Sequence, residues 1–513
     1  MKRFILSFIT LLNSLTSNAK EIGLDRRIDE AFQPISDFFN KYVFYPVSMP
    51  FGDYPFVIYL LVGSALFFTI YFIFPNVRYL KTAINVVAGK YDKIEQTNSN
   101  ATDGEVSHFQ ALATAVSGTV GNGNIAGVAL AIALGGPGAT FWMIVCGLLG
   151  MSTKFVECTL GVYYRDVDED GTVYGGPMYY ISKGLKSKGF KTLGTIAASL
   201  FAIFCIGGSF GGGNAAQSNQ ATIVIKSLLG YESTFAGAVI GMILAVLVGV
   251  IIIGGIKRIA SVTERIVPFM ALLYIIACLY ILILNFSFID DAFALIIREA
   301  FNPSAIGAGG LIGVLMIGFQ RAAFSNEAGA GSASIAHSAV KTKYAASEGL
   351  VALLEPFIDT VVICTMTALV IITFNSTGAF VYGGDGMGGV LIDGIVYEGA
   401  GITQKAFAQY IPGSDIFLTI AVVLFAVSTM ISWSYYGLQS WKFLFGRGKA
   451  ADLTYKILFL VFVVIGAAAS MNSIWAFSDA MIFAMVFPNM IGLYFLFPIV
   501  KQELKKYLQA IKK

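Results

Sequence analysis

Residues 118–138 read GTVGNGNIAGVALAIALGGPG and begin inside a longer apolar run, residues 108–134, that could cross a membrane as a helix. The first part of this stretch contains several glycines together with Asn122 and Asn124. Unwinding a helix in hydrocarbon costs several kcal/mol for each orphaned backbone group, so it is tolerated only around a polar cavity. The pattern therefore predicts a broken span whose backbone forms part of a site.

The composition places this break in a membrane protein. The chain has 513 residues, of which 56% are hydrophobic and only 13% are charged, whereas soluble domains average about 25% charged residues. The class indicated is an all-α polytopic membrane protein. The net charge of +3 comes from scattered basic residues, which excludes a nucleic-acid partner. Two histidines and five cysteines without CxxC spacing form no metal cluster, and no cofactor is expected.

The apolar runs predict the number of membrane crossings and their direction. A span needs about 20 apolar residues. We predict about eleven spans, at residues 56–75, 108–134, 138–164, 193–225, 235–256, 266–285, 306–336, 346–374, 415–441, 454–470 and 474–499. Lys and Arg accumulate in every second connection and in the C-terminal tail. By the positive-inside rule, the N-terminus is periplasmic and the C-terminus cytoplasmic.

The chain divides into five segments. Residues 1–19 carry Lys2 and Arg3 before a short apolar core, as in a secretory signal peptide, although an uncleaved interfacial helix is the alternative. Residues 20–107 comprise an outer N-terminal segment, one extra transmembrane helix and a cytoplasmic linker. Residues 108–285 and 286–499 each form a five-helix repeat, and residues 500–513 form a basic cytoplasmic tail.

The two repeats have opposite orientations in the membrane. Without the span at 56–75, the remaining spans split into two halves whose first helices travel in opposite directions. Each half opens on a glycine-rich, interrupted span, at residues 118–127 and at 318–331. Paired breaks of this kind point to a binding site near the bilayer midplane. The alternative is that small residues only permit close helix packing.

The broken spans and their polar neighbours favour a zwitterion and a cation. Freed N–H groups at the start of a half-helix favour a carboxylate, and freed carbonyls favour a cation such as Na⁺. Asn214 and Gln217 are three residues apart and are expected to share an inward helix face. Thr429 and Ser432 can offer oxygens to Na⁺, or can hydrogen-bond to the preceding turn of their own helix. Trp433 is either a pocket wall or ordinary packing.

Ionisable residues inside spans are candidates for function. Lys154 and Glu157 are expected to pair with each other, and Arg321 and Glu327 to brace the second break. Asp359 lies near the middle of its span with no basic residue close to it in sequence. It is the strongest carboxylate candidate for cation coupling, with a pair to Arg321 as the alternative.

Several blocks resemble one family. The motifs "SGTVGNGNIAGVALAIALGGPGATFWM", "LLGMSTKFVECTLGVYYR", "GGPMYYI", "FQRAAFSNEAGAGSASIAHSAVKT" and "FIDTVVICTMTALVI" are similar to those of the alanine or glycine:cation symporters, also called sodium:alanine symporters. The resemblance covers residues 35–500. It implies the leucine-transporter-type fold, a five-plus-five inverted repeat with one extra N-terminal helix. It also implies sodium-coupled uptake of alanine, glycine or a similar small neutral amino acid through a bacterial inner membrane.

The resemblance and the arguments above give one candidate site. The substrate-binding candidates are Thr119, Gly121, Asn122, Gly123, Gln217, Gly318 and Trp433. The sodium-binding candidates are Asn124, Asp359, Thr429 and Ser432. The family more often has threonine at position 122, so Asn122 bears on which amino acid is carried. Glu355-Pro356 is also unusual for the family and could alter the bending of its helix.

Functions other than symport require sequence motifs of their own. An intramembrane enzyme would need a nucleophile or a metal motif such as HExxH, and an ATP-driven pump would need GxxxxGK[ST]; neither is in the sequence, so no enzyme activity is expected. A proton-coupled amino acid transporter, a glutamine-type sodium symporter and, from a different class, an ion channel remain alternatives. The expected partners are a small neutral amino acid, sodium and the lipid bilayer, with no obligate protein partner.

Overall fold

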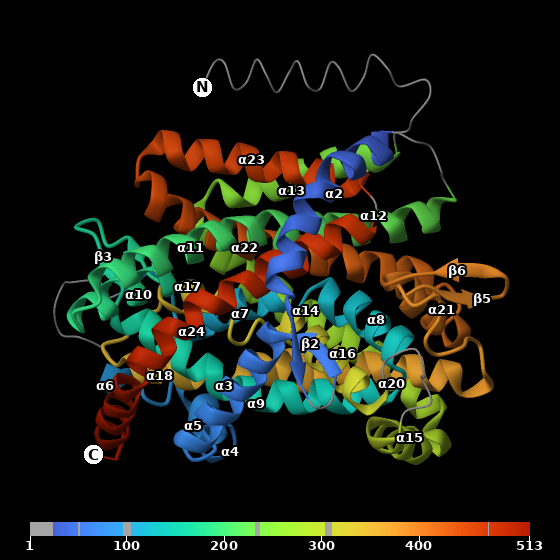
Figure 1. Ribbon diagram of the computed structural model, residues 1–513, viewed down its shortest axis with the longest axis horizontal. Coiled ribbons are helices and arrows are strands. Elements are labelled where there is room, and N and C mark those ends of the chain that lie inside the picture. The colour runs from blue at the N-terminus through green and yellow to red at the C-terminus, as the bar shows by residue number, and fades with distance from the viewer. Residues whose placement is uncertain are drawn as a thin grey trace.

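The computed structural model describes residues 24–49, 52–95, 104–230, 236–302, 310–469 and 471–512. The predicted signal peptide, residues 1–19, lies outside these ranges. The described chain is mostly helical, and its long helices run roughly along one direction of the molecule (Figure 1). Among the described residues, seven helices are long and apolar enough to cross a membrane, or eight if the bent pair His108–Thr119 and Asn122–Gly135 is one span. Two shorter apolar helices, Phe56–Tyr71 and Ala236–Ile252, accompany them.

The helices of the first half follow one another with few strands between them. They are α2 (Leu24–Val43), α3 (Phe56–Tyr71), α4 (Pro75–Arg78), α5 (Leu80–Val87), α6 (Asp92–Glu95), α7 (His108–Thr119), the 3-10 turn η1 (Asn122–Asn124), α8 (Ala126–Gly135), α9 (Gly138–Tyr163), α10 (Pro177–Ser187), α11 (Lys191–Phe210), the π-helical η2 (Gly211–Ala215), α12 (Ala216–Leu229), α13 (Ala236–Ile252) and α14 (Gly255–Leu284).

The second half contains a second set of helices, some long and some of a single turn. They are η3 (Phe286–Phe288), α15 (Ile289–Phe301), α16 (Gly310–Asn326), α17 (Ala333–His337), α18 (Ala345–Val351), α19 (Leu354–Pro356), the π-helical η5 (Phe357–Cys364), α20 (Thr365–Phe374), η6 (Asn375–Thr377), α21 (Ala400–Tyr410), α22 (Ser414–Phe445), α23 (Lys449–Ala468) and α24 (Met471–Ala510). Three antiparallel hairpins join β1 (Pro46–Met49) to β2 (Gly52–Pro55), β3 (Asp166–Val167) to β4 (Val173–Tyr174), and β5 (Val390–Ile392) to β6 (Ile395–Tyr397).

The connecting elements gather at the two ends of the bundle. Figure 1 shows α6, α10, α18 and the C-terminus at one end, and α15, α21 and the β5–β6 hairpin at the other. α6, α10 and the C-terminus belong to segments for which the sequence predicts a cytoplasmic location, and α18 opens the span predicted at residues 346–374. The two sets of connections are therefore separated by the length of the long helices, as a chain that threads repeatedly through a bilayer requires.

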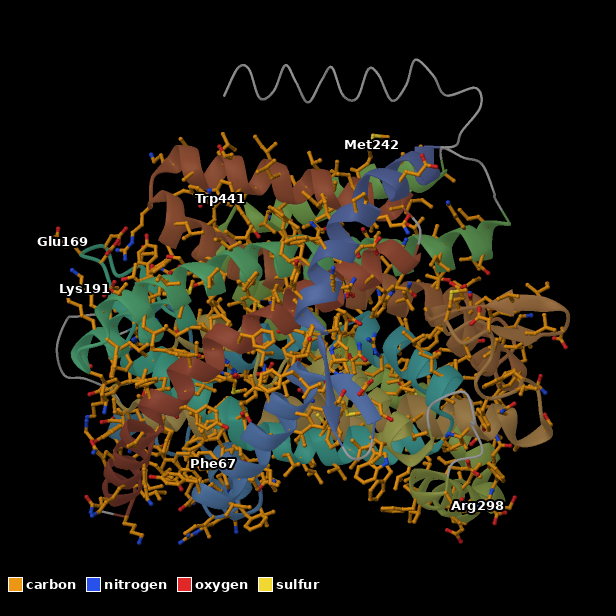
Figure 2. The ribbon with its side chains drawn as sticks, in the orientation of Figure 1. Phe67, Glu169, Lys191, Met242, Arg298 and Trp441 are labelled. Carbon is orange, nitrogen blue, oxygen red and sulfur yellow. The ribbon has the colours of Figure 1, made fainter. Side chains whose placement is uncertain are left out.

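The helices differ in how much of their surface the protein covers. The apolar window of α22 is 72% buried and that of α23 only 28%, so α22 is central and α23 peripheral. Met242 of peripheral α13 lies at the outside of the bundle (Figure 2) and is exposed. Such outward apolar side chains are expected where lipid, not water, surrounds the protein.

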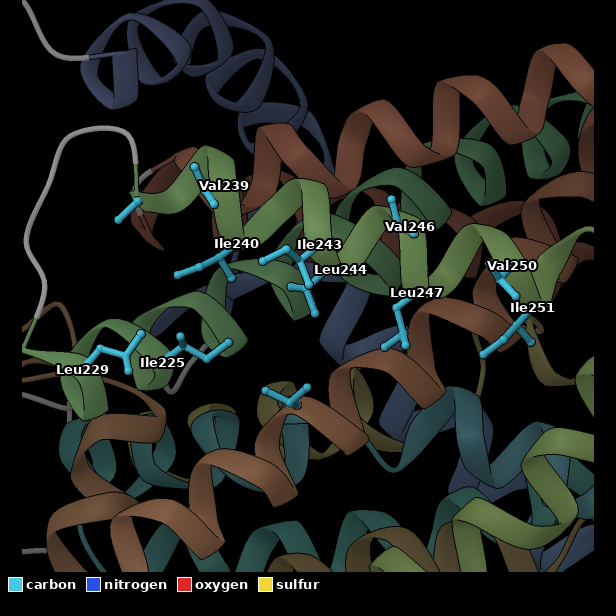
Figure 3. A pocket seen from close by; sticks show the side chains of 12 residues that line it. Ile225, Leu229, Val239, Ile240, Ile243, Leu244, Val246, Leu247, Val250 and Ile251 are labelled. Atoms are coloured by element: carbon cyan, nitrogen blue, oxygen red, sulfur yellow. The ribbon is translucent and has the colours of Figure 1, made fainter.

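A large apolar groove runs along the outer side of α13. It has a volume of about 840 Å³ and is lined by aliphatic side chains of α12 and α13 with Val423 of α22 (Figure 3). Val246, one of its walls, is 69% exposed. The groove contains none of the predicted site residues, so the site has to be sought among the buried polar groups of the inner helices.

Candidate functional site

The first predicted break is present between α7 and α8. The helix pair bends by 56° at this point. The amide of Gly121 donates to Asn124 Oδ1 at 2.8 Å, and the amide of Asn122 donates to Gln217 Oε1 at 3.0 Å. In an uninterrupted helix these two amides would bond to carbonyls of the preceding turn. Because these amides bond elsewhere, carbonyl oxygens in the last turn of α7 can bond to groups outside the helix.

Gly121 is required at this break by the closeness of two side chains. A Cβ atom built on Gly121 would lie 2.4 Å from Thr429 Oγ1 and 3.1 Å from Gln217 Oε1. The nearest atoms to a Cβ on Gly123 would belong to Ser325, from 3.5 Å, which is ordinary contact. The unwound backbone at Gly121 is thus brought directly against polar groups of α12 and α22.

Thr429 bonds to one of the freed carbonyls. The Thr429 hydroxyl donates to the carbonyl oxygen of Ser117 at 3.0 Å. The Ser117 hydroxyl in turn donates to the Ser428 carbonyl oxygen at 2.7 Å. Ser432, one turn further along α22, is fully buried, and its hydroxyl has no hydrogen-bond partner among the described residues. Of the two α22 hydroxyls predicted for sodium, that of Thr429 therefore contacts the broken end of α7.

Asp359 lies at the same junction, in η5. Its side chain is fully buried and accepts hydrogen bonds from Asn124 Nδ2 at 2.7 Å, from Ser325 Oγ at 2.9 Å and from Thr360 Oγ1 at 2.7 Å. Within the described part of the chain no basic side chain forms an ion pair with it. The alternative pairing with Arg321 is wrong, because Arg321 pairs with Asp479 of α24. A buried carboxyl held only by neutral donors is a group that a small cation would stabilise.

The side chains of Gln217 and Asn214 were predicted to share one helix face, but they bond to different elements. Gln217 reaches the break, where it also accepts from the Asn122 amide, and its Nε2 donates to the Gly212 carbonyl at 2.9 Å. Asn214 instead donates to the Phe459 carbonyl of α23 at 2.6 Å. The cause is the π-helical η2, which contains Asn214 and has a wider turn than an α-helix. Residues three apart across it no longer project in the same direction.

Trp433 connects α22 to the second break. Its indole Nε1 donates to Glu327 Oε1 at 2.9 Å. The ring packs on Gly213, where a Cβ atom would lie 2.2 Å from Trp433 Cγ. The Trp433 side chain is therefore held by both packing and a hydrogen bond, close to the residues that surround Gln217.

The second break follows α16, which ends at Asn326. Glu327 takes a left-handed conformation, φ 55°, and accepts a hydrogen bond from Ser332. The Gly329 amide donates to Glu157 Oε1 at 3.0 Å, and Asn489 Nδ2 donates to the Gly329 carbonyl at 2.8 Å. Glu157 thus supports this break and does not pair with Lys154, which pairs with Glu355. Glu327 braces the break as expected, whereas Arg321 does not.

Two predicted substrate residues lie apart from these contacts. Gly318 is inside the uninterrupted part of α16, where a Cβ atom would lie 2.6 Å from the Ala139 carbonyl of α9. This glycine serves helix packing, the alternative reading of small residues. The Thr119 hydroxyl donates to carbonyls of its own helix, Ala115 at 3.3 Å and Val116 at 3.4 Å. The remaining candidates other than Ser432 lie around the α7–α8 break or, in the case of Trp433, against η2 and the second break.

Other polar groups at the site were not predicted. Ser325 bonds to Asp359, and Tyr436 lies against Gly118, where a Cβ atom would be 2.8 Å from its hydroxyl oxygen. Among the described residues, Asn122 Oδ1 and the Tyr436 hydroxyl are buried without a partner, like the hydroxyl of Ser432. Unpartnered buried polar atoms also lie elsewhere in the described part of the bundle, so these three are of interest because of where they stand, on the elements that meet at the α7–α8 break or on α22.

The chain was compared with known families and proteins. Residues 38–513 match the sodium:alanine symporter family. The sodium/alanine symporter AgcS of Methanococcus maripaludis is 40% identical over 460 residues, covering 89% of this chain and 95% of that protein. The putative sodium/proton-dependent alanine carrier protein YrbD of Bacillus subtilis is 37% identical, covering 88% and 89%. The probable sodium/glutamine symporter GlnT of the same organism is 33% identical, covering 89% and 88%.

Solved structures show weaker likeness. MhsT in complex with L-phenylalanine has a TM-score of 0.48 and 15% identity, covering 78% of this chain and 99% of that chain. A mutant of the Eremococcus coleocola manganese transporter has a TM-score of 0.49 and 14% identity, covering 78% and 81%. Scores of this size carry no conclusion about this chain. The match to the family over nearly the whole sequence does: this chain belongs to the sodium:alanine symporter family, whose members are membrane transporters and not enzymes.

Proposed function

We propose that this protein imports alanine, glycine or a similarly small neutral amino acid with Na⁺ across the inner membrane of a bacterium. The observation that carries the proposal is the buried meeting of the α7–α8 break with Thr429 and Asp359. It combines freed backbone groups, a hydroxyl and a carboxyl in one place. Those are the groups that a zwitterion and a hard cation require.

The architecture proposed for this function is the leucine-transporter type. It has about eleven membrane crossings, of which ten form two inverted halves, with a periplasmic N-terminus and a cytoplasmic C-terminus. The breaks after α7 and after α16 support the two halves, because each interrupts the first long span of its half. The basic connections support the orientation. Alternating access would then expose the same site to either side in turn.

Sodium would bind where α7, α22 and η5 converge. Thr429 and Ser432 would supply hydroxyl oxygens, Asn124 an amide oxygen and Asp359 a carboxylate. Asn124 Oδ1 accepts from the Gly121 amide, so the ligand set and the unwound backbone are in direct contact. Oxygen ligands of this kind suit a hard cation better than a transition metal. No titratable side chain other than Asp359 belongs to this set, which favours Na⁺ over a proton.

The amino acid would bind beside the same break. Its carboxylate would meet amides near Gly123, and its ammonium would meet carbonyls of the second break or the Gln217 side chain. Gly121 is crowded by Thr429 and Gln217, and Trp433 is packed against Gly213. Little volume is left for a side chain, which favours hydrogen or methyl.

A second substrate has one observation in its favour. Asn122 Oδ1 is buried and has no partner in the described part of the chain. It could accept a hydrogen bond from a ligand amide, as in glutamine. The similarity of this chain to the probable sodium/glutamine symporter GlnT also supports glutamine as a substrate. Sodium-coupled glutamine uptake is therefore the second candidate.

Uptake into liposomes that contain the purified protein tests the proposal. Labelled alanine would be supplied with a Na⁺, K⁺ or pH gradient alone, and unlabelled glycine, serine, glutamine and leucine would compete. We expect uptake with Na⁺ only, blocked by glycine and serine but not by leucine. Full uptake driven by a pH gradient without Na⁺ would refute sodium coupling. Stronger competition by glutamine than by glycine would favour the second candidate.

A further inference from the structure

Both histidines of the chain lie between pairs of carboxyl groups, away from the proposed substrate and sodium site. His108 Nε2 is 2.8 Å from Glu95 Oε2, and its Nδ1 bonds to Glu348. His337 Nδ1 is 2.5 Å from the other oxygen of Glu348, and its Nε2 is 3.6 Å from Glu355 Oε2. Carboxyl and imidazole groups therefore alternate along one chain, Glu95–His108–Glu348–His337–Glu355, which we call the buried relay.

The inner end of the relay approaches the second break. Glu355 Oε1 is 2.9 Å from Lys154 Nζ of α9, and both side chains are fully buried. Lys154 also interacts electrostatically with Glu157 and Glu327. These two are the carboxyls that bond to Gly329 and to Trp433. The relay thus ends beside the groups that hold the broken backbone.

The other end of the relay reaches a cavity. Glu95 and His108 line a hollow of about 280 Å³ together with Ser107 and Lys341. It lies among the connections at the end of the bundle that contains α6 and the C-terminus. Burial tends to raise the pKa of Glu95, but its bonds to His108, Thr342 and Tyr507 lower that pKa overall. Glu95 therefore joins the cavity to His108 through its carboxyl group.

The charges of this region do not balance without bound protons. Five carboxyl groups interact here with three basic groups. The carboxyls are Glu95, Glu157, Glu327, Glu348 and Glu355, and the basic groups are Lys154, His108 and His337. With both imidazoles protonated, two negative charges remain. Unpaired charge is costly in a buried region, so protons are expected to bind there.

Other titratable side chains face the relay from neighbouring helices. They are Cys158 of α9, which interacts with Glu348 and Glu355, Tyr436 of α22 and Asp359 of η5, which interact with Glu355, and Tyr507 of α24, which donates to Glu95 Oε1 at 2.7 Å. None of them changes the alternation of acids and imidazoles. His108 forms hydrogen bonds through both of its ring nitrogens, whereas His337 bonds through Nδ1 and its Nε2 faces Glu355 Oε2 without a hydrogen bond. Both nitrogens are needed when a ring takes up a proton on one side and releases one on the other.

We propose that the buried relay conducts protons between the cytoplasmic cavity and the Glu355–Lys154 pair behind the second break. A proton from water reaches Glu95 and passes to His108 Nε2, while the Nδ1 proton of His108 passes to Glu348. Glu348 takes up that proton at Oε2, and rotation of its carboxyl group presents the proton to His337 Nδ1. As His337 Nδ1 accepts it, the Nε2 proton of His337 passes to Glu355. Each step breaks one N–H or O–H bond and forms another, so one proton moves and no other bond changes. A water molecule or a small movement spans the 3.6 Å between His337 and Glu355.

The inference adds a proton movement to the proposed sodium symport and rests on the chain being a transporter. Its test uses liposomes that contain the full-length protein, a trapped pH-sensitive dye and a clamped membrane potential. Proton flux after an imposed pH step is measured with and without Na⁺ and alanine, and labelled alanine uptake is measured in the same liposomes. The relay ends beside the second break, which alternating access would open to the other side of the membrane. Wild type is therefore expected to conduct protons above protein-free liposomes when Na⁺ and alanine cycle the transporter.

Three variants separate the relay from its surroundings. His337→Gln interrupts it, Glu95→Gln removes its acceptor at the cavity, and Lys341→Gln changes the same cavity without touching the chain of acids and imidazoles. We expect both relay variants to lose the proton flux and Lys341→Gln to retain it. Size-exclusion profiles and alanine uptake report whether each variant is folded.

The outcomes distinguish the two proposals. Wild-type flux equal to that of protein-free liposomes in every condition overturns the relay, even where sodium-driven uptake is present. Flux that persists in folded His337→Gln and Glu95→Gln overturns it as well. Relay variants that lose uptake, in a protein whose wild type conducts no protons, assign the cluster a purely structural role. A lack of sodium-driven uptake in wild type contradicts the proposed function but leaves the flux measurement valid.

Discussion

The hydroxyl of Thr429 donates to the carbonyl oxygen of Ser117 at 3.0 Å, so α22 satisfies a backbone group that the α7–α8 break has freed. The bond joins a helix of the second half to the interrupted helix of the first. A cation at this junction would share the Thr429 oxygen with α7. The bond and the proposed sodium site therefore depend on the same atom.

Thr429→Val tests this dependence because it keeps the shape and removes the oxygen. We expect the Na⁺ concentration for half-maximal alanine uptake to rise about fivefold, since one hydrogen bond or ligand is worth roughly 1 kcal/mol. The order of competing amino acids should stay the same. Thr419→Val on the same helix is the control, because its buried hydroxyl has no partner among the described residues. An equal rise in both variants would contradict a specific role for Thr429.

Asp359→Asn keeps the volume of the side chain and removes its charge. Ser325 and Thr360 can still donate to the remaining oxygen. If the carboxylate balances a bound cation, the variant should insert normally but lose sodium-driven uptake. Uptake and the elution of the purified protein are measured together, with the exposed Asp415→Asn as a control. Unchanged uptake and sodium dependence would remove Asp359 from the proposed site.

Gly121→Ala and Gly123→Ala form a matched pair two residues apart. The new methyl group at position 121 would lie 2.4 Å from Thr429 Oγ1, and the one at position 123 would begin contact at 3.5 Å. We expect Gly121→Ala to abolish uptake by displacing Thr429 or the break, and Gly123→Ala to retain most of it. Equal activity of the two variants would show that the approach of Thr429 to this backbone is not needed for transport.

Trp433→Ala removes a large side chain next to the proposed substrate position. Leucine and phenylalanine should then inhibit labelled alanine uptake, which they should not do in wild type. Exclusion by tight packing is worth roughly 1–3 kcal/mol, so the gain should be about tenfold to a hundredfold. Trp441→Ala, further along the same helix, controls for general loosening of α22. Competition that is unchanged in Trp433→Ala, or changed equally in both, would place Trp433 outside the substrate boundary.

Much of the site could be predicted because its residues are anomalies in apolar runs. Asn124, Asp359 and Gln217 stand out in spans that should be apolar, and all three lie at the α7–α8 break. A polar group in a span has few tolerable places, so its presence already indicates where it must point. The same argument identified both interrupted spans.

The errors came from facts that only the three-dimensional packing supplies. The glycine pattern included Gly318 in the second break, but the helix continues to Asn326. The chain turns at Glu327, which has a positive φ. A glycine pattern cannot predict a positive φ at a glutamate. The position of Asn214 was misjudged because a π-helical turn shifts the phase of its helix. The pairing of Arg321 with Asp479 joins residues 158 positions apart, and sequence spacing contains no information about it.

That pair gives a prediction about stability. Arg321 and Asp479 are both buried, and the guanidinium also lies over the rings of Phe324 and Trp475 at 5.7 and 5.9 Å. Asp479→Asn leaves a buried cation without its counter-charge, which typically costs about 3–5 kcal/mol. We expect a clearly lower unfolding temperature in detergent. The double variant Arg321→Met, Asp479→Leu should recover most of the loss, because an apolar pair avoids desolvating both charges. Glu503→Gln, which breaks the Lys506 pair in which the lysine is 59% exposed, should change the unfolding temperature little. If Asp479→Asn unfolds at the temperature of Glu503→Gln, the Arg321–Asp479 pair does not stabilise the bundle.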